Sequence, residues 1–296
     1  MTDSVPLPAW PIQRRYRHAS WNPGRGPCWA WGTRTFVMGI INATDDSFSG
    51  DGVADRLDDA VALARELVEG GADIIDIGGA SSRPRAEPTP VAVERRRAVR
   101  VIEAVRCELD RLGIDIPISV DTTTAAVAEP ALTAGADVVN DITGFRTDPE
   151  LAPLVARHGA GAVLMHNQRG REHTDLIADV TTGLNISLDI CAAAGVGADR
   201  IVADPGFGFG FGVSQNLELM RRLPELWPLD LPLLIGTSRK STVGAITNTG
   251  IDDRLFGTAA TITAAICAGI DVVRVHDAAQ MTQAIRMTDA IVRPAR

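Results

Sequence analysis

Ionisable and amide side chains follow several short apolar runs of this sequence, and four of them together could hold a flat heterocycle. Asp121 and Asp204 each end an apolar run, Asn140 lies at the end of a third, and Lys240 follows a fourth. Carboxylates accept hydrogen bonds from ring N–H groups, an ammonium donates to a ring carbonyl, and a carboxamide does both. In one partly desolvated pocket this set suits a nucleobase-like or pterin-like ring.

A single aspartate after a strand is more often a helix cap or a turn residue than a binding group. Asp148, Asp175 and Asp252 fit that role. Asp121 and Asp204 differ, because each ends an apolar run and would point up the mouth of a barrel. Their occurrence together with the amide and the ammonium is not explained by capping.

A second set of side chains has the composition of a diphosphate site. Arg83, Arg274 and His276 can donate to phosphate oxygens, and Asn42 can supply an oxygen to a bridging Mg²⁺. Because the first and last strands of a closed barrel are neighbours, Arg274 and His276 would converge with Asn42. The net charge of −8 means that a bound anion must be met by a local basic pocket.

Other catalytic signatures are absent from the sequence. It contains no H-E-x-x-H, no Walker G-x-x-x-x-G-K-[ST] and no G-x-S-x-G motif. The glycines between Gly206 and Gly212 recur at every second residue, and we interpret this run as a βα loop after Asp204 rather than a nucleotide-binding loop.

The elements that must position these groups repeat along the chain from residue 35 onward. Each repeat is an apolar, β-prone run, a polar or glycine-bearing break and a segment with helical spacing of apolar residues. Eight such units favour a (β/α)₈ (TIM) barrel, with its active site at the carboxyl ends of the strands, over an open doubly wound sheet. The expected strands are residues 35–42, 73–78, 117–121, 137–141, 162–166, 201–204, 232–236 and 272–276. The expected helices include residues 56–68, 91–112, 129–134, 149–158, 177–193, 215–223, 254–268 and 279–292.

The sequence divides into an N-terminal extension, residues 1–33, and one barrel domain, residues 34–296. The extension holds four of the five tryptophans and the basic residues Arg14, Arg15 and Arg17. We expect its aromatic side chains to pack against the barrel, although a partner-binding or mobile arm has the same composition.

The composition, with 45% hydrophobic and 22% charged residues, is that of an ordinary globular enzyme. Four widely spaced cysteines without metal-ligand spacing are typical of reduced thiols, which favours a cytoplasmic location. The N-terminus lacks the apolar segment of a signal peptide, and the apolar stretch near residues 257–270 is too short to span a bilayer. The acidic net charge argues against nucleic-acid or membrane partners.

Eight segments, in order over about 240 residues, resemble dihydropteroate synthase, the folate-pathway enzyme inhibited by sulfonamides. They are MGIINATDDSFSGDG from Met38, DIIDIGGASSRP from Asp73, ISVDT from Ile118, VVNDITG from Val138, VLMH from Val163, ADPGFGFG from Ala203, GTSRKSTVGAI from Gly236 and RVHD from Arg274.

The resemblance implies a homodimeric transferase that uses Mg²⁺ to join a pterin diphosphate to p-aminobenzoate. It implies that the pterin ring is held by Asp121, Asn140, Asp204 and Lys240. Arg274 and His276 would stabilise the leaving diphosphate. The resemblance makes both of them catalytic residues, together with Asp121, Asp204 and Lys240.

The metal and arylamine positions follow from the same resemblance. Asn42 and Asp51 would bind the Mg²⁺. The residues implied near p-aminobenzoate are Ser82, Arg83 and Ser241, and Met165, Phe209 and Phe211 are further expected substrate-binding residues.

Several positions depart from the family pattern. Asp45 stands where proline is usual, Asp51 is displaced by one residue, and Ala80 replaces a glutamate. Phe211 and Gly212 stand where the family normally has lysine and its neighbour, in a loop that borders the p-aminobenzoate pocket. Added aromatic bulk there could exclude a sulfonamide and admit the smaller arylamine, which leads to the hypothesis of a sulfonamide-insensitive synthase.

Two other readings share the ring pocket. A pterin-dependent methyltransferase domain has no use for a diphosphate or arylamine site, so Arg83, Lys240 and His276 argue against it. A paralogue that binds pterin without turnover would explain the altered first loop, Ala80 and Phe211.

Overall fold

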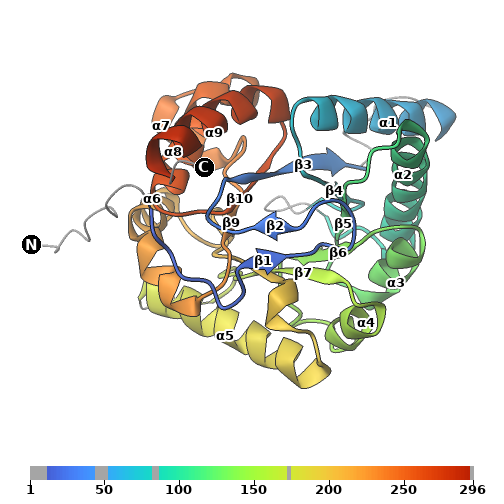
Figure 1. Ribbon diagram of the computed structural model, residues 1–296, viewed down its shortest axis with the longest axis horizontal. Coiled ribbons are helices and arrows are strands. Elements are labelled where there is room, and N and C mark those ends of the chain that lie inside the picture. The colour runs from blue at the N-terminus through green and yellow to red at the C-terminus, as the bar shows by residue number, and fades with distance from the viewer. Residues whose placement is uncertain (1–11, 44–52, 82–86, 172–174, 294–296) are drawn as a thin grey trace, which may run out of the picture.

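The protein folds as a barrel of parallel strands surrounded by helices (Figure 1). The computed structural model describes residues 12–43, 53–81, 87–171 and 175–293. The eight-stranded sheet has the order β8-β7-β6-β5-β4-β3-β10-β9, and a parallel bridge between Ala203 and Leu233 joins its two edges, so the predicted TIM barrel is confirmed. The strands are β3 (Phe36–Asn42), β4 (Ile74–Gly78), β5 (Ile118–Asp121), β6 (Val138–Asp141), β7 (Gly161–Met165), β8 (Ile201–Asp204), β9 (Leu234–Ile235) and β10 (Val272–Val275).

The helices occupy the predicted segments with small shifts at their ends. Sequence analysis missed one of them, α7, because its small residues after Lys240 carry little apolar periodicity. The helices are α1 (Val53–Glu69), α2 (Val91–Leu112), α3 (Ala125–Thr133), α4 (Leu151–His158), α5 (Leu176–Ala194), α6 (Val213–Arg222), α7 (Ser241–Thr247), α8 (Leu255–Cys267) and α9 (Ala278–Val292), with short 3₁₀ turns η1 (Ala198–Arg200), η2 (Leu223–Leu229) and η3 (Ile251–Asp253).

Two separate apolar clusters explain why the strands are apolar on both faces. Successive side chains of a strand point to opposite sides of the sheet. Val139 and Val273, for example, pack outward in the layer between strands and helices, whereas their neighbours Val138 and Val272 pack inside the barrel. The inner cluster also contains Phe36, Met38, Ile74, Val163, Val202 and Leu234.

A hairpin from the N-terminal extension closes the end of the barrel at which its strands begin. Strands β1 (Ser20–Trp21) and β2 (Trp29–Ala30) pair antiparallel, and Figure 1 shows them across the centre of the ring of strands. Trp21, Trp29 and Trp31 are buried in the inner cluster. The Trp29 ring stacks on Phe36 with centroids 4.3 Å apart. These aromatic side chains therefore fill the part of the barrel farthest from the carboxyl ends of its strands.

A buried ion pair anchors the segment that precedes this hairpin. Arg14 Nη1 lies 2.7 Å from Asp271 Oδ2, and the two side chains are 1% and 0% exposed. Tyr16 donates to the other carboxylate oxygen of Asp271 at 2.6 Å, and burial raises the pKa of the Tyr16 phenol. Asp271 also accepts from the backbone N–H of Leu233 at 2.9 Å. The extension is thus tied to the beginnings of β9 and β10.

We expect Arg14→Met to lower the free energy of unfolding by about 3 kcal/mol, because removing one partner leaves a buried carboxylate without its cation. Activity per folded molecule should not change, since the pair lies at the opposite end of the barrel from the strand ends. Urea denaturation measures the loss. Arg25→Met is the matched control, because Arg25 is 40% exposed and pairs loosely with Asp137 at 3.5 Å. Equal destabilisation by the two substitutions would contradict the argument.

Helix α5 is, within the described residues, long and apolar enough by length and composition to cross a membrane. Sequence analysis had singled out only the shorter stretch near α8. One face of α5 is buried on the barrel through residues such as Leu176, Val180 and Leu184. The apolar character of α5 is therefore that of a helix covering a parallel sheet.

Candidate functional site

The inward-facing positions at the carboxyl ends of the strands carry polar groups. Two residues beyond the buried inner side chains Ile74, Val138, Val202 and Val272, the same face presents a carboxylate, an amide or a guanidinium. These inner polar residues are Asp76 on β4, Asp121 on β5, Asn140 on β6, Asp204 on β8 and Arg274 on β10. The strand alternation therefore brings together four of the residues singled out from the sequence.

Arg274 crosses the barrel mouth and binds two carboxylates. Its Nε lies 2.6 Å from Asp76 Oδ2, and its Nη2 lies 2.7 Å from Asp121 Oδ2. Asn140 donates to the same Asp76 oxygen at 3.0 Å. The prediction placed Arg274 only with the diphosphate; the structure places it also among the carboxylates assigned to the ring.

Asp76 is a candidate site residue that sequence analysis missed. Its side chain is fully buried, and its Oδ1 has no hydrogen-bond partner among the described residues. A carboxylate between Ile75 and Ile77 in an apolar strand was the available signal, because an ionised group is buried only where it is paired. A prediction based on strand ends alone misses Asp76, because this residue lies inside its strand.

Burial perturbs both predicted carboxylates. It raises the pKa of Asp121 to about 7, against the opposing effect of the Arg274 charge. Burial also raises the pKa of Asp204 to about 6, although the N–H of Gly206 and the charge of Lys240 favour the ionised form. Perturbed carboxylates in a strand-end cluster are typical of functional sites.

Lys240, which is the only lysine in the sequence, lies in the same cluster. Burial, reinforced by the Arg274 charge, lowers its pKa to about 8. Its ammonium lies 3.9 Å from the centroid of the Phe209 ring, and the Arg169 guanidinium lies 4.6 Å from the same centroid. Phe209 therefore connects the loop after β8 to the buried ammonium.

The loops after β7 and β8 are fastened to each other. His166 Nε2 lies 2.8 Å from Gln168 Oε1, and the Gln168 backbone N–H donates to the Phe209 carbonyl at 3.1 Å. The backbones approach so closely that a Cβ on Gly206 would lie 1.9 Å from the His166 carbonyl oxygen, and one on Gly210 only 2.4 Å from the Arg169 nitrogen. The alternating glycines of this loop therefore serve close backbone packing.

Phe211 occupies a different environment from Phe209. Its ring is buried and stacks on His166, with centroids 6.1 Å apart and an interplanar angle of 23°. The sequence hypothesis gave Phe211 the part of added bulk beside the arylamine. In the structure the Phe209 ring lies beside the Lys240 ammonium, whereas the Phe211 ring lies against His166.

The predicted diphosphate residues meet where β3 and β10 lie side by side. Asn42 Nδ2 lies 3.4 Å from His276 Nε2, and Ser238 Oγ lies 3.0 Å from His276 Nδ1. Burial lowers the pKa of His276 to about 4, so the imidazole is neutral at pH 7. Ser238, on the segment leading to Lys240, was not among the predicted site residues.

Five further positions were predicted from the sequence. Met165 ends β7, is buried and pairs with Asp204 in the sheet register. Ser241 is exposed at the first turn of α7. The predicted residues Ser82, Arg83 and Asp51 lie outside the described residues. The roles assigned to all of these side chains stay predictions.

Known proteins match this chain over the barrel. The family described as pterin binding enzyme matches residues 38–276. The chain is 45% identical over 271 residues to a dihydropteroate synthase of Synechocystis, covering 89% of this chain and 92% of that protein. It is 42% identical over 259 residues to the dihydropteroate synthase of Bacillus subtilis, covering 88% and 89%.

Solved structures agree with the sequence matches. A crystal structure of dihydropteroate synthase from Clostridium difficile in the presence of pteroic acid superposes with a TM-score of 0.85 at 43% identity, covering 89% of this chain and 99% of that chain. A Xanthomonas albilineans dihydropteroate synthase with 4-aminobenzoic acid superposes with a TM-score of 0.84 at 36% identity, covering 92% and 97%. The chain therefore belongs to the pterin-binding enzymes and, within them, to the dihydropteroate synthase family.

Proposed function

We propose that this protein catalyses the dihydropteroate synthase reaction, in which p-aminobenzoate and 6-hydroxymethyl-7,8-dihydropterin diphosphate give 7,8-dihydropteroate and diphosphate. The observation that carries the proposal is the Asp76–Arg274–Asp121 ion-pair group, with Asn140 attached, at the barrel mouth. Such a buried group presents hydrogen-bond acceptors and donors that suit a flat, polar ring.

Ring binding is assigned to the groups whose charge is already perturbed by burial. Asp121 and Asp204, when ionised, accept from pterin N–H groups, and Asn140 offers both an acceptor and a donor. Lys240 donates to a ring carbonyl or nitrogen. Holding the electron-rich ring between carboxylates favours the positive charge that develops when the methylene carbon loses its leaving group.

Departure of diphosphate is assigned to Arg274 and His276. The bond between the methylene carbon and the diphosphate oxygen breaks, and its electron pair leaves on the diphosphate. The lone pair of the arylamine nitrogen forms the new C–N bond, and that nitrogen loses a proton to solvent. Arg274 is charged and donates to the departing oxygens. The neutral His276 can donate there through Nε2–H, in the tautomer whose Nδ1 accepts from the Ser238 hydroxyl.

Mg²⁺ is proposed as the metal, with Asn42 and Asp51 as its protein ligands. Among the described residues no cluster of three or more His, Cys, Asp or Glu side chains could hold an ion. The carboxamide of Asn42, beside His276, fits an ion that keeps waters and takes substrate phosphate oxygens. When bound, the ion would neutralise charge developing on the diphosphate.

The test is the initial rate of diphosphate release from the pterin diphosphate with Mg²⁺, measured with and without p-aminobenzoate. We expect release that requires the arylamine and yields 7,8-dihydropteroate in equal amount. Pterin binding by calorimetry without any release would instead identify a non-catalytic paralogue. Binding of a reduced pterin but not of its diphosphate would favour the methyltransferase alternative.

We further propose that the enzyme is insensitive to sulfonamides. The support is the Phe211–Gly212 pair in place of the usual lysine, and the packing of Phe211 on His166, which shapes the loop that carries Phe209. We expect Phe211→Lys to lower the sulfonamide inhibition constant about tenfold or more, about 1.4 kcal/mol in sulfonamide binding, while changing the KM for p-aminobenzoate less than threefold. Inhibition measured at several p-aminobenzoate concentrations checks this. An unmodified enzyme already inhibited as strongly as an ordinary synthase would end the proposal.

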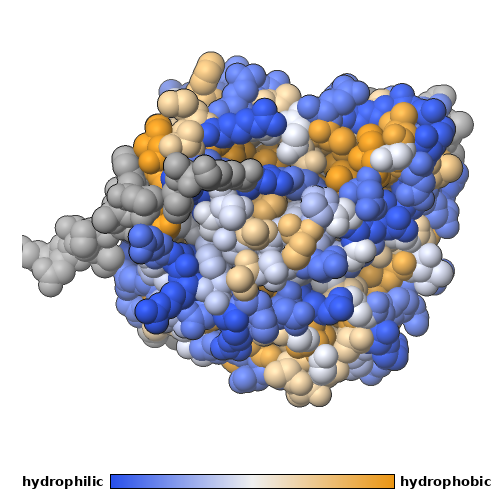
Figure 2. Space-filling model, in the orientation of Figure 1, coloured by the Kyte–Doolittle hydropathy of each residue, from blue (hydrophilic) through white to orange (hydrophobic). Residues whose placement is uncertain are grey.

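A homodimer is proposed through α7, η3 and α8. Phe256 is 85% exposed, and Ile246 and Ile251 are also exposed on these elements. Figure 2 shows apolar surface near α7 and α8, at the upper left of the view. Clustered exposed apolar side chains mark protein interfaces. We expect Phe256→Arg to give a monomer in sedimentation velocity, whereas Met287→Arg on α9 leaves the dimer; a monomeric parent protein would refute the proposal.

A cytoplasmic location is proposed on the state of the cysteines. All four are free thiols, and Cys28 and Cys107 are exposed. Free exposed thiols persist in reducing compartments.

A further inference from the structure

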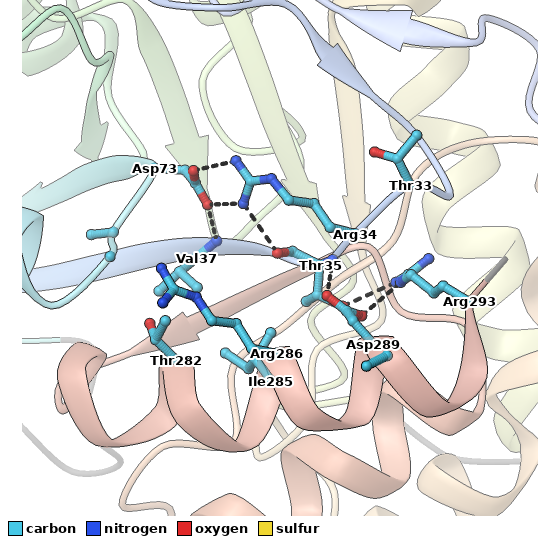
Figure 3. A pocket seen from close by; sticks show the side chains of 13 residues that line it. Thr33, Arg34, Thr35, Val37, Asp73, Thr282, Ile285, Arg286, Asp289 and Arg293 are labelled. Atoms are coloured by element: carbon cyan, nitrogen blue, oxygen red, sulfur yellow. Dashed lines mark hydrogen bonds and ion pairs between the residues drawn. The ribbon is translucent and has the colours of Figure 1, made fainter. Parts of the chain in front are cut away.

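A cavity with several charged side chains in its lining lies at the end of the barrel opposite to the catalytic cluster, and Figure 3 shows it from close by. Its volume is about 690 Å³, within the range of small-molecule sites. It is bordered by the residues that begin β3 and β4 and by the side of α9, so it shares no residue with the site at the strand ends. Its charged lining consists of Arg34, Asp73, Arg286, Asp289 and Arg293.

The first carboxylate of this cavity is already neutralised. Asp73 forms a bidentate pair with Arg34, with N–O distances of 2.8 and 2.5 Å. Its Oδ2 also accepts from the Val37 backbone N–H at 2.9 Å. The Arg34 guanidinium lies 4.1 Å from the centroid of the Phe36 ring, which fixes its plane.

The second carboxylate is neutralised in the same way. Asp289 Oδ1 accepts from Arg293 Nε at 2.7 Å and from the Thr35 hydroxyl at 2.8 Å. Its Oδ2 accepts from the Thr35 backbone N–H at 2.7 Å. Arg293 Nη2 donates to the Thr35 hydroxyl at 3.0 Å and to the Ile270 carbonyl at 2.7 Å. Neither aspartate therefore offers a charge to a third arginine.

Arg286 is that third arginine. It extends from α9 along the cavity (Figure 3), and no hydrogen bond or ion pair joins it to the described residues. One helical turn earlier, Thr282 is only 8% exposed, and its buried hydroxyl has no partner in the described part of the chain. The cavity thus has three guanidinium groups against two carboxylates, together with an unused hydroxyl in its wall.

We propose that this cavity binds a small organic anion, a carboxylate or a phosphate monoester, with its charged group on the Arg286 guanidinium. A planar guanidinium binds two oxygens of such a group at once. An anionic oxygen drawn against α9 would also give the Thr282 hydroxyl an acceptor. Ile285 and Val37 supply apolar wall for the carbon part of the ligand. The proposal is independent of the synthase reaction.

The test observes the cavity directly in the full-length protein. Ile285 lines the cavity and is 2% exposed, so its labelled δ1 methyl group reports binding there by NMR, with Ile285→Val providing the assignment. The probes are inorganic phosphate and acetate, titrated separately at constant ionic strength, which distinguishes the phosphate source of charge from the carboxylate. We expect a saturable shift of the Ile285 methyl signal with at least one probe.

Substitutions distinguish a specific binding site from general electrostatic attraction of anions to the protein. Arg286→Ala should weaken binding about tenfold or more, because hydrogen bonds to charged groups are worth at least that factor. Thr282→Val, which keeps the shape of the side chain, should weaken it about two- to tenfold. Arg221→Ala removes an exposed arginine on α6 and should have no effect. An Ile285 signal that moves with neither probe, or moves equally in Arg286→Ala, overturns the proposal.

Discussion

Replacing Arg274 by methionine is expected to lower kcat/KM by roughly a hundred- to a thousandfold and the free energy of unfolding by about 3 kcal/mol. Arg274 binds Asp76 and Asp121 at 2.6 and 2.7 Å, and Asp76 is fully buried. Without the guanidinium, two neighbouring buried carboxylates lose their shared cation. One of them must then take up a proton, because two close carboxylates cannot both stay ionised. The catalytic loss follows because a protonated acid no longer accepts from the ring as an anion does.

The measurement combines urea denaturation with the rate of diphosphate release. Arg222→Met is the matched control, since Arg222 pairs closely with Glu218 and Glu225, and more loosely with Asp175 at 3.7 Å, but on the partly exposed surface. We expect that control to cost less than about 1 kcal/mol and to leave activity unchanged. A stable but inactive Arg274→Met protein would show that the ion-pair group serves the reaction only. An unstable protein of normal specific activity would remove Arg274 from the proposed mechanism.

Replacing Lys240 by methionine is expected to lower kcat/KM about a hundredfold while changing the free energy of unfolding by less than about 1 kcal/mol. Burial disfavours the charged form of this side chain, and its described contact is with the Phe209 ring rather than a carboxylate within ion-pair distance. Methionine has a similar length and no charge to bury. Stability should therefore survive the change that abolishes donation to the ring. A loss of stability as large as that for Arg274→Met would contradict this account.

The pH dependence of kcat/KM should report the ionisation of Asp121 and Lys240. The pKa of Lys240 is lowered to about 8 and that of Asp121 raised to about 7. Asp121 is ionised above its pKa and Lys240 is charged below its own, so activity of the free enzyme should rise with pH through about 7 and fall through about 8. Because Lys240 is the only lysine, a protein labelled with [ε-¹³C]lysine gives one signal that titrates with this pKa. A signal titrating near the ordinary value of 10.5 would refute the assignment of the basic limb.

The barrel could be predicted from the sequence because its elements depend on local patterns. Short apolar runs followed by amphipathic segments specify strands covered on both sides, and all eight expected strands end at, or within one residue of, their observed ends. Among the helices, α7 was not predicted, because its seven residues are fixed by their place after Lys240 rather than by apolar spacing. The length and apolar character of α5 were not singled out either, because hydropathy does not show which face of a helix the barrel buries.

The site residues that lie at the ends of strands could be predicted from the sequence. Asp121, Asn140, Asp204 and Arg274 do face the barrel interior together, because ring closure brings alternate residues of neighbouring strands to one surface. Asp76 was missed because it lies inside its strand, where its importance depends on a guanidinium from a strand that follows 198 residues later.

The sequence by itself determined the order of strands and helices, the alternation that sends Asp121, Asn140, Asp204 and Arg274 inward, and the family. Only the tertiary structure decided which charges meet: Arg274 with Asp76 and Asp121, Phe209 rather than Phe211 on Lys240, and Arg286 beside two satisfied aspartates. The physical reason is the range of the interactions. Periodicity is a property of neighbours along the chain, whereas an ion pair or a cavity depends on the side-chain directions of residues that only the closed barrel brings within a few ångströms.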